Sequence, residues 1–237
     1  MTERDMKGSM VINLPCRDMV FYESWQAILQ ALVHGHTWMS QTHPGAQFGI
    51  ASVKRPHVAH ARNKMIDEAL KSGFEWILWL DDDAVPPPDL IERLMSHKKK
   101  WVAPLFVTRG PKRESPAAVL VKDVLRPIAF HKGGLMLAHT TGLHCMLMHR
   151  DVVLSTKEHL DGKALFVFGE RAPWSGTMMT EDVWFCMHST AAGNRLWIDC
   201  DTEVGHVTAS VLKMKDCNLT KNGPPKTRII TPEDLAS

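Results

Sequence analysis

Two groups of acidic residues in this chain have types and spacings that suit chemistry on a phosphorylated ligand. The first is Asp81-Asp82-Asp83, which directly follows the continuous apolar run 76–80. In an extended segment, residues i and i+2 point to the same side, so Asp81 and Asp83 can present two carboxylates together while Asp82 points away. Paired carboxylates suit Mg²⁺ or Mn²⁺, which prefer oxygen ligands and often share substrate phosphates. An isolated Asp-x-Asp is also common in solvated turns, so its context must decide.

The second group is Glu181-Asp182, at the start of an amphipathic stretch that Gly193 closes. A carboxylate within hydrogen-bond reach of a hydroxyl can accept its proton during attack on an electrophile. Acids at a helix start also interact well with the exposed N–H groups, so the pair has a structural reading too. The two readings are compatible, because a helix start is a firm platform for a positioned carboxylate.

The elements that must position these acids alternate between strands and helices over the first hundred residues. We expect a strand at 10–14, ended by Pro15, and a helix at about 19–33. A loop with Pro44-Gly45 follows, then a helix at 58–71 and a strand at 76–80, buried on both faces. A helix at about 89–97 and a strand at 101–107 continue the pattern. This alternation predicts a mostly parallel, Rossmann-like α/β sheet, in which ligands bind beyond the carboxyl ends of strands.

The second half has a different pattern. Short runs over 117–149, separated by glycines, predict a smaller antiparallel portion. A helix at about 150–159, a helix at about 181–192 and a strand at 196–199 follow. The tail from about residue 210 is polar and rich in lysine. We therefore expect a single catalytic domain over 1–209, with a ligand-binding half at 1–107 and a catalytic half at 108–209, and a polar tail at 210–237.

Bulk composition narrows the protein class. The chain has 237 residues, 44% of them hydrophobic and 23% charged, which is enough for a substantial core. A net charge of +2 does not by itself imply a nucleic-acid partner. The apolar run near the start is too short for a signal peptide or a membrane span, so we expect a cytoplasmic protein. Five widely spaced cysteines without a Cys-x-x-Cys pair are expected to be reduced.

The ordered set of motifs resembles GT-A glycosyltransferases, particularly family 2-like enzymes of the compact soluble, phage-type kind. The resemblance rests on Ala61-Arg62-Asn63, the run 76–84 with its triple aspartate, Thr180-Glu181-Asp182 and Gly205-His206-Val207. It extends from about residue 11 to 207. It implies a GT-A mixed sheet flanked by helices, and transfer of a sugar from a nucleotide diphosphate sugar, most simply a UDP-sugar, to an acceptor hydroxyl. The expected stereochemical outcome is inversion.

The resemblance also implies roles for individual residues. A divalent Mn²⁺ or Mg²⁺ would be held by Asp83, Asp81 and His206, and would stabilise the departing diphosphate. Asp182 would be the catalytic base, with Glu181 as its rival. The residues expected at the nucleotide and its phosphates are Pro15, Arg17, Asp18, Arg62, Asp81, Asp82 and Lys213.

The acceptor and two rival classes stay open at this stage. Basic clusters at 98–100 and 109–113 permit a hydroxymethylated pyrimidine in DNA, and a protein or saccharide acceptor is the alternative. A nucleotidyltransferase would also use acids and metals at strand ends, but no clear phosphate-cradling glycine loop is found. A non-catalytic nucleotide-sugar-binding module would not need the second acidic pair. No membrane partner is expected, and the oligomeric state is not predicted.

Overall fold

The computed structural model describes residues 8–16, 20–54, 57–109, 113–122, 124–128, 133–172, 176, 178–208 and 211–212. Five helices are found there: α1 Tyr22–Thr42, α2 Val58–Lys71, α3 Leu90–Ser96, α4 Arg150–Leu160 and α5 Glu181–Ala191. The strands in the same residues are β1 Met10–Cys16, β2 Phe48–Lys54, β3 Trp76–Leu80, β4 Ala84–Val85, β5 Trp101–Leu105, β6 Ala118–Val121, β7 Val124–Pro127, β8 Leu135–Ala138, β9 Cys145–His149, β10 Leu196–Glu203, β11 Gly205–Val207 and β12 Val211–Leu212.

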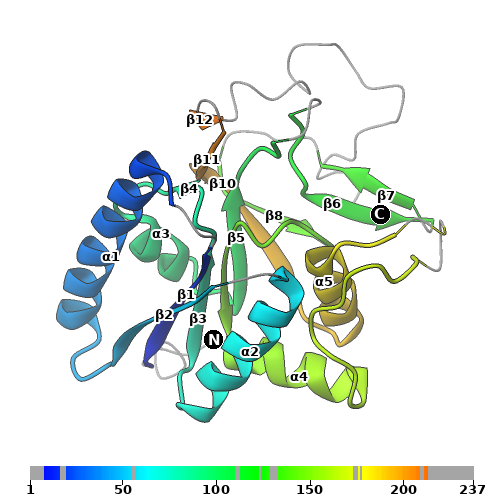
Figure 1. Ribbon diagram of the computed structural model, residues 1–237, viewed down its shortest axis with the longest axis horizontal. Coiled ribbons are helices and arrows are strands. Elements are labelled where there is room, and N and C mark those ends of the chain that lie inside the picture. Colours follow the sequence, from blue (N-terminus) through cyan, green and yellow to red (C-terminus); the bar gives the residue numbers. More distant parts are fainter. Residues whose placement is uncertain are drawn as a thin grey trace.

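A seven-stranded mixed sheet in the order β2-β1-β3-β9-β5-β10-β8 forms the centre of the molecule (Figure 1). Helices α1 and α3 pack on one face, and α2, α4 and α5 on the other. Alternate residues of β3 enter the two apolar clusters, with Ile77 and Trp79 in one and Leu78 in the other. The predicted α/β class and the strand buried on both faces are therefore confirmed.

The mostly parallel sheet expected from the first half is only partly correct. Strands β2, β1 and β3 are parallel, and so are β5 and β10. However, β9 from the second half lies between β3 and β5 and runs antiparallel to both. The antiparallel portion is thus built into the main sheet, with β6 and β7 as a separate two-stranded ribbon. Neighbouring segments of the sequence gave no signal for this insertion, because pairing is a tertiary choice.

Three element boundaries differ from the expectation. Strand β2 was expected to be loop, because it lies at the edge of the sheet and its residues Phe48–Lys54 are mostly half-exposed, without a continuous apolar run. Helix α1 continues beyond Val33 to Thr42, past Gly35, whose missing side chain leaves room for Ile91 of α3. Strand β1 does not stop at Pro15, which pairs in register with Val53.

Two further sheet features matter for the site. Strand β10 continues past Asp199 to Glu203 after a register shift, and β11 follows almost at once. Strand β11 then pairs antiparallel with β4, which directly follows the triple aspartate. Among the helices of the described ranges, none is both long and apolar enough to cross a membrane.

Candidate functional site

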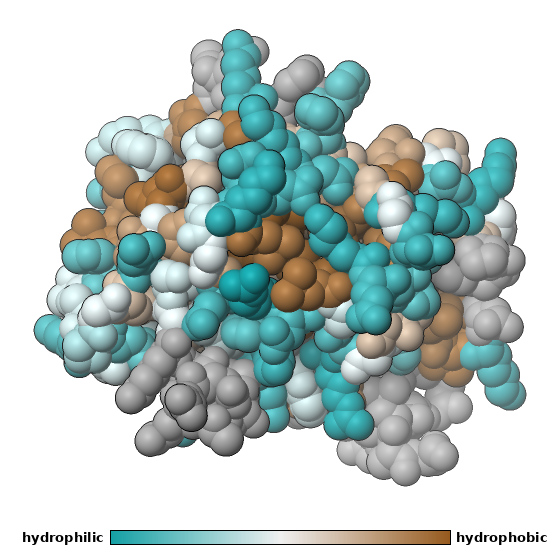
Figure 2. Space-filling view, turned by 90° about the horizontal axis from the view of Figure 1, so that it is seen from below, coloured by the Kyte–Doolittle hydropathy of each residue, from teal (hydrophilic) through white to brown (hydrophobic). Residues whose placement is uncertain are grey.

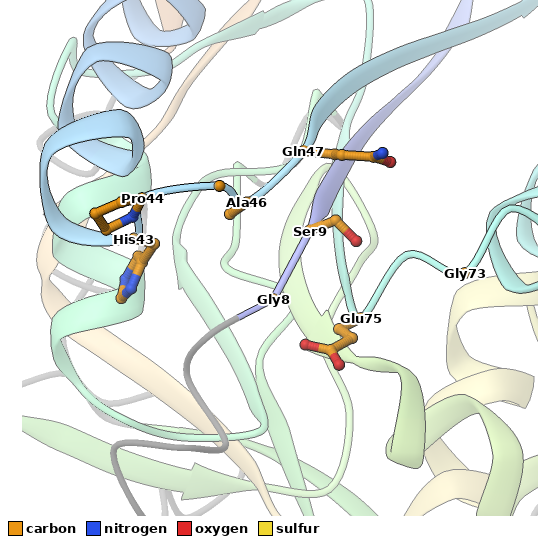
Figure 3. Close-up of a pocket in the computed structure, with 9 residues that line it drawn as sticks. Gly8, Ser9, His43, Pro44, Ala46, Gln47, Gly73 and Glu75 are labelled. Atoms are coloured by element: carbon orange, nitrogen blue, oxygen red, sulfur yellow. The ribbon is translucent and has the colours of Figure 1, made fainter.

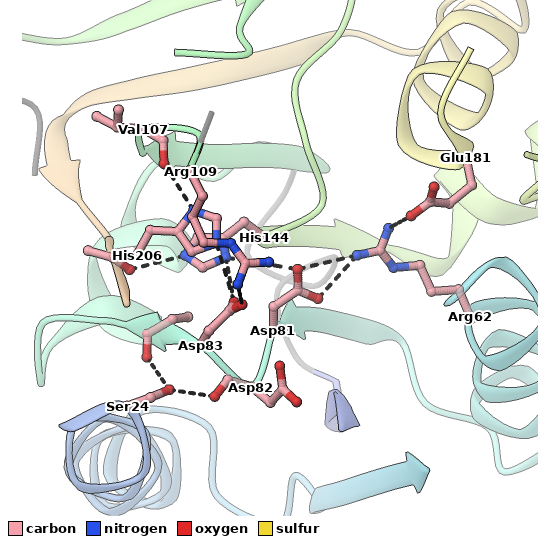
Figure 4. Close-up of polar contacts among 12 residues, drawn as sticks. Ser24, Arg62, Asp81, Asp82, Asp83, Val107, Arg109, His144, Glu181 and His206 are labelled. Carbon is pink, nitrogen blue, oxygen red and sulfur yellow. Dashed lines mark hydrogen bonds and ion pairs between the residues drawn. The ribbon is translucent and has the colours of Figure 1, made fainter. Parts of the chain in front are cut away.

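Strand pairing brings two histidines to the triple aspartate (Figure 4). Strands β3 and β9 pair with Leu80 opposite Cys145, so His144, just before β9, lies beside the residues just after β3. The backbone N–H of Asp81 donates to the carbonyl of His144 at 2.9 Å. From the other side, β11 pairs with β4 with His206 opposite Ala84, and the N–H of Val207 donates to the carbonyl of Asp83 at 2.8 Å.

Asp83, His144 and His206 form a buried cluster in which one ligand atom of each lies within 4.8 Å of the others. The Oδ1 atom of Asp83 lies 3.5 Å from Nδ1 of His144 and 3.4 Å from Nε2 of His206. The other Asp83 oxygen is 2.8 Å from Nη1 of Arg109. One carboxylate and two imidazoles converging on a point make a plausible divalent-metal site.

The hydrogen bonds behind the two imidazoles fit a metal. The Nδ1 atom of His206 lies 2.9 Å from the carbonyl of Val107, and Nε2 of His144 lies 3.1 Å from the carbonyl of Gly205. A carbonyl can only accept, so in each neutral ring the proton belongs on the outer nitrogen. The nitrogen that faces Asp83 is then left with its lone pair. Backbone carbonyls orient metal-binding histidines in this way in many metal sites.

The charges of the cluster are strongly coupled. Burial alone would raise the pKa of Asp83, but the two imidazoles outweigh it and hold that pKa far below its usual range. Burial would lower the pKa of His144, but Asp81 and Asp83 raise it to about 9. Without a metal, a proton on His144 therefore balances the acids. A metal ion would take over that charge and release the proton.

Arg62 connects the two acidic groups. Its side chain is 3% exposed, with Nη2 3.1 Å from Asp81 and Nη1 2.7 Å from Glu181. Burial would lower the pKa of Arg62, but Asp81 and Glu181 together raise it, so the guanidinium is charged. Burial raises the pKa of Glu181, with Arg62 opposing the shift. One acid from each sequence motif is therefore tied to the same cation.

Asp182 differs from Glu181 in its surroundings. It is half-buried at the start of α5, and its Oδ1 accepts hydrogen bonds from the N–H of Val183 at 2.8 Å and from the hydroxyl of Thr180. A Cβ atom on Gly142 would come within 3.2 Å of the other Asp182 oxygen. A side chain at position 142 would therefore crowd this carboxylate.

These side chains line one cavity of about 310 Å³. Arg62, Asp81, His144, Glu181, Asp182 and His206 all border it, with Phe106 and Arg109 on its wall. It lies beyond the carboxyl end of β3, where open α/β sheets bind ligands. The expectation that the two acidic groups share a site is consistent with this arrangement.

A larger cavity of about 610 Å³ lies at the opposite end of the parallel strands (Figure 3). Ser9, Gln47 and Glu75, which border it, directly precede β1, β2 and β3. The amino end of such strands is the side that open α/β sheets do not use for ligands. Size alone therefore does not make it the catalytic pocket, and we assign no chemistry to it.

The other predicted site residues are distributed as follows. Pro15 is buried near the end of β1. Asp82 is buried, its carboxylate points away from Asp83, and its carbonyl accepts from the hydroxyl of Ser24 at 2.9 Å (Figure 4). Asp81 contacts Arg62, so its predicted metal contact stays a prediction. Arg17, Asp18 and Lys213 lie outside the described residues.

Two residues of the site were not singled out for it from the sequence. His144 stands in no recognisable motif, and only the pairing of β9 with β3 reveals its position. Arg109 was noted as part of a basic cluster, whereas the structure pairs it with Asp83. Lys100, from the other basic cluster, contacts Asp151 at 2.6 Å.

Comparison with known proteins supports the fold. The A197 protein from STIV has a similar structure, at 16% identity and a TM-score of 0.52, over 84% of this chain and 86% of that one. A Drosophila β-1,4-galactosyltransferase 7 mutant, solved with manganese, UDP-Gal and xylobiose, gives 13% identity, a TM-score of 0.43 and coverages of 96% and 79%. A UDP-glucose pyrophosphorylase bound to UDP-glucose gives 7%, 0.45, 89% and 93%.

A family match addresses the activity. Residues 32–119 match the model of Anp1, a mannosyltransferase family. The chain has a GT-A-like glycosyltransferase fold. The matched segment contains Arg62 and the triple aspartate, and it ends before His144 and the α5 acids. No curated protein sequence matches the chain.

Proposed function

We propose that this glycosyltransferase is metal-dependent and transfers a sugar from a nucleotide diphosphate sugar to an acceptor hydroxyl. The observation that carries the proposal is the buried Asp83, His144 and His206 cluster at the carboxyl end of β3, which shares one cavity with Asp182. The metal, when bound, would supply positive charge to the departing diphosphate. Two imidazoles beside one carboxylate favour Mn²⁺ over Mg²⁺, because Mg²⁺ strongly prefers oxygen ligands.

In this proposal the residues of the chain divide the work. Asp83 and the two histidines hold the cation, and their backbone partners keep the rings in place. Arg62 neutralises Asp81 and Glu181, so neither acid is a free base while these ion pairs persist. Asp182 is then the carboxylate that can accept the proton of the acceptor hydroxyl in an inverting transfer.

For the donor, a UDP-sugar is the simplest proposal. Pro15 at the end of β1 and Arg62 and Asp81 beside the cavity lie at the end of the sheet where nucleotides bind in related architectures. The acceptor class is less constrained. Because Lys100 and Arg109 are engaged by acids, DNA loses part of its basic footprint, and a saccharide or protein acceptor is the simpler proposal.

The test is donor hydrolysis and transfer by the purified protein across a panel of nucleotide diphosphate sugars, with Mn²⁺, Mg²⁺, Zn²⁺, Fe²⁺ or a chelator. We expect turnover with Mn²⁺ above that with Mg²⁺, and loss of turnover with the chelator. Acceptors are then compared as oligosaccharides, peptides and DNA containing hydroxymethylpyrimidine. Turnover that is equal with and without chelator would refute the metal dependence.

A further inference from the structure

Apolar side chains are unusually concentrated on one exposed part of the surface. In the described residues twelve large apolar side chains are exposed, and six of them lie within residues 20–33: Val20, Phe21, Tyr22, Trp25, Leu29 and Val33. Trp25, Leu29 and Val33 are four residues apart and form one ridge along α1. Tyr22 is 73% exposed and Val33 67%. Apolar patches of this kind on a folded protein mark interaction sites.

The ridge lies on the side of α1 that faces the open edge of the sheet. On its other side α1 contacts α3, where His34 lies 2.9 Å from Glu92. His36 stacks edge-on against Phe48 of β2, with ring centroids 5.5 Å apart. Ile50, two residues along the strand on the same face, is 57% exposed. Apolar side chains reach the surface at the left of Figure 2, the side on which α1 lies in Figure 1.

Strand β2 adds a second, independent feature to the same face. It is the last strand on its side of the seven-stranded sheet and pairs only with β1 among the described strands. An edge strand exposes backbone N–H and C=O groups that can pair with another strand. Natural edges are commonly protected by charge, proline or a bulge. Phe48–Lys54 has no proline, a regular register with β1, and a single charged residue at its end.

We propose that a second copy of this chain covers the face formed by α1 and β2, giving a two-fold dimer in which β2 pairs antiparallel with β2. A two-fold axis normal to the sheet places both α1 helices on the same side of the continuous sheet, so the two apolar ridges face each other. One partner thus satisfies the open strand edge and the uncovered helix face together.

Charge and area favour this occupant. Apart from its histidines, α1 carries Glu23 as its one charged residue, so the same face can meet itself without strong repulsion. The absence of Lys and Arg from α1 disfavours an anionic membrane, which amphipathic helices usually bind through cations. The aromatic rings of Phe21, Tyr22 and Trp25 expose on the order of 300 Å². The remaining ridge and the strand edge bring the face toward the about 800 Å² per partner of a stable interface.

The dimer is tested by sedimentation of the full chain, independently of any activity. We expect wild type to sediment at twice the 26.7 kDa chain mass. Val33→Glu on the ridge and Ile50→Lys on the strand should each weaken dimerisation by about tenfold or more. Leu154→Glu, at an apolar residue of α4 with 42% exposure, is the matched control and should leave the dimer intact. Circular dichroism and thermal melts establish that each variant is folded.

Three outcomes would overturn the proposal. The first is a wild-type monomer at about 100 µM, where even a weak specific dimer would be populated. The second is a dimer that both folded variants leave unchanged, which would place the interface elsewhere. The third is a monomer that co-sediments with phosphatidylcholine vesicles and loses this binding in Val33→Glu, which would make the face a lipid contact. Activity with nucleotide sugars bears on none of these results, so the proposed function stands or falls separately.

Discussion

The acidic pair after β3 and the acidic pair at the start of α5 are built in the same way. In each pair one acid contacts Arg62: Asp81 in the first and Glu181 in the second. The other acid is directed elsewhere, Asp83 to two histidines and Asp182 to the helix start beside Gly142. A single buried cation thus separates, in each pair, an acid held for structure from an acid available for chemistry. The comparison teaches that spacing identifies the pairs, whereas the position of Arg62 distinguishes their members.

The largest effect is expected at Asp83, the available acid of the first pair. Asp83→Asn keeps the size but removes the charge that the metal needs, so Mn²⁺ affinity should fall by more than about 100-fold and turnover should be lost. Isothermal titration with Mn²⁺ measures the affinity directly. Asp67→Asn, at an exposed acid of α2 that contacts Lys157, is the matched control. Normal Mn²⁺ binding by Asp83→Asn would remove this residue from the metal site.

The next largest effect is expected at Asp182, the available acid of the second pair. Asp182→Asn should lower the transfer rate by about 10²–10⁴-fold, because the acceptor hydroxyl loses its base. Donor affinity, measured by titration with the nucleotide sugar, should persist. Glu181→Gln should have the smaller effect on the rate. The reverse order of the two variants would assign the base to Glu181 and break the comparison.

Arg62 tests the shared element itself. Arg62→Met leaves Asp81 and Glu181 near each other in a buried site without their cation, and removing one partner of a buried ion pair costs about 3–5 kcal/mol. Urea unfolding of the variant measures this loss. Arg93→Met is the control, because its pair with Asp89 is partly exposed and such pairs contribute about 0–1 kcal/mol. Equal stability of the two variants would mean that Arg62 does not hold the pairs together.

The smallest effect in the series is expected at His206. His206→Gln removes one imidazole but leaves Asp83 and His144, so Mn²⁺ affinity should fall by about 10–100-fold rather than vanish. His34→Gln, at a half-exposed histidine that contacts Glu92, should leave Mn²⁺ affinity unchanged. Unaltered affinity in His206→Gln would show that the ring only packs beside Asp83.

Local pattern was sufficient for several elements and for the motifs. Continuous apolar residues predicted β3, helical spacing predicted α2 with its observed bounds, and the acids after β3 and at α5 stood out by type and spacing. Each of these signals lies within one segment of the chain, where periodicity and burial are coupled directly. The division of the chain into halves at 1–107 and 108–209, and the roles of the individual site residues, remain predictions.

Only the tertiary structure decided which residues meet. The insertion of β9 between β3 and β5 brings His144 to Asp83, and the pairing of β11 with β4 brings His206 there. Likewise, the packing of α2 places Arg62 between acids that are 100 residues apart in the sequence. Strand order and helix packing depend on long-range contacts that no local period encodes. For that reason the sequence by itself determined the α/β class and the acidic pairs, while the fold selected their partners.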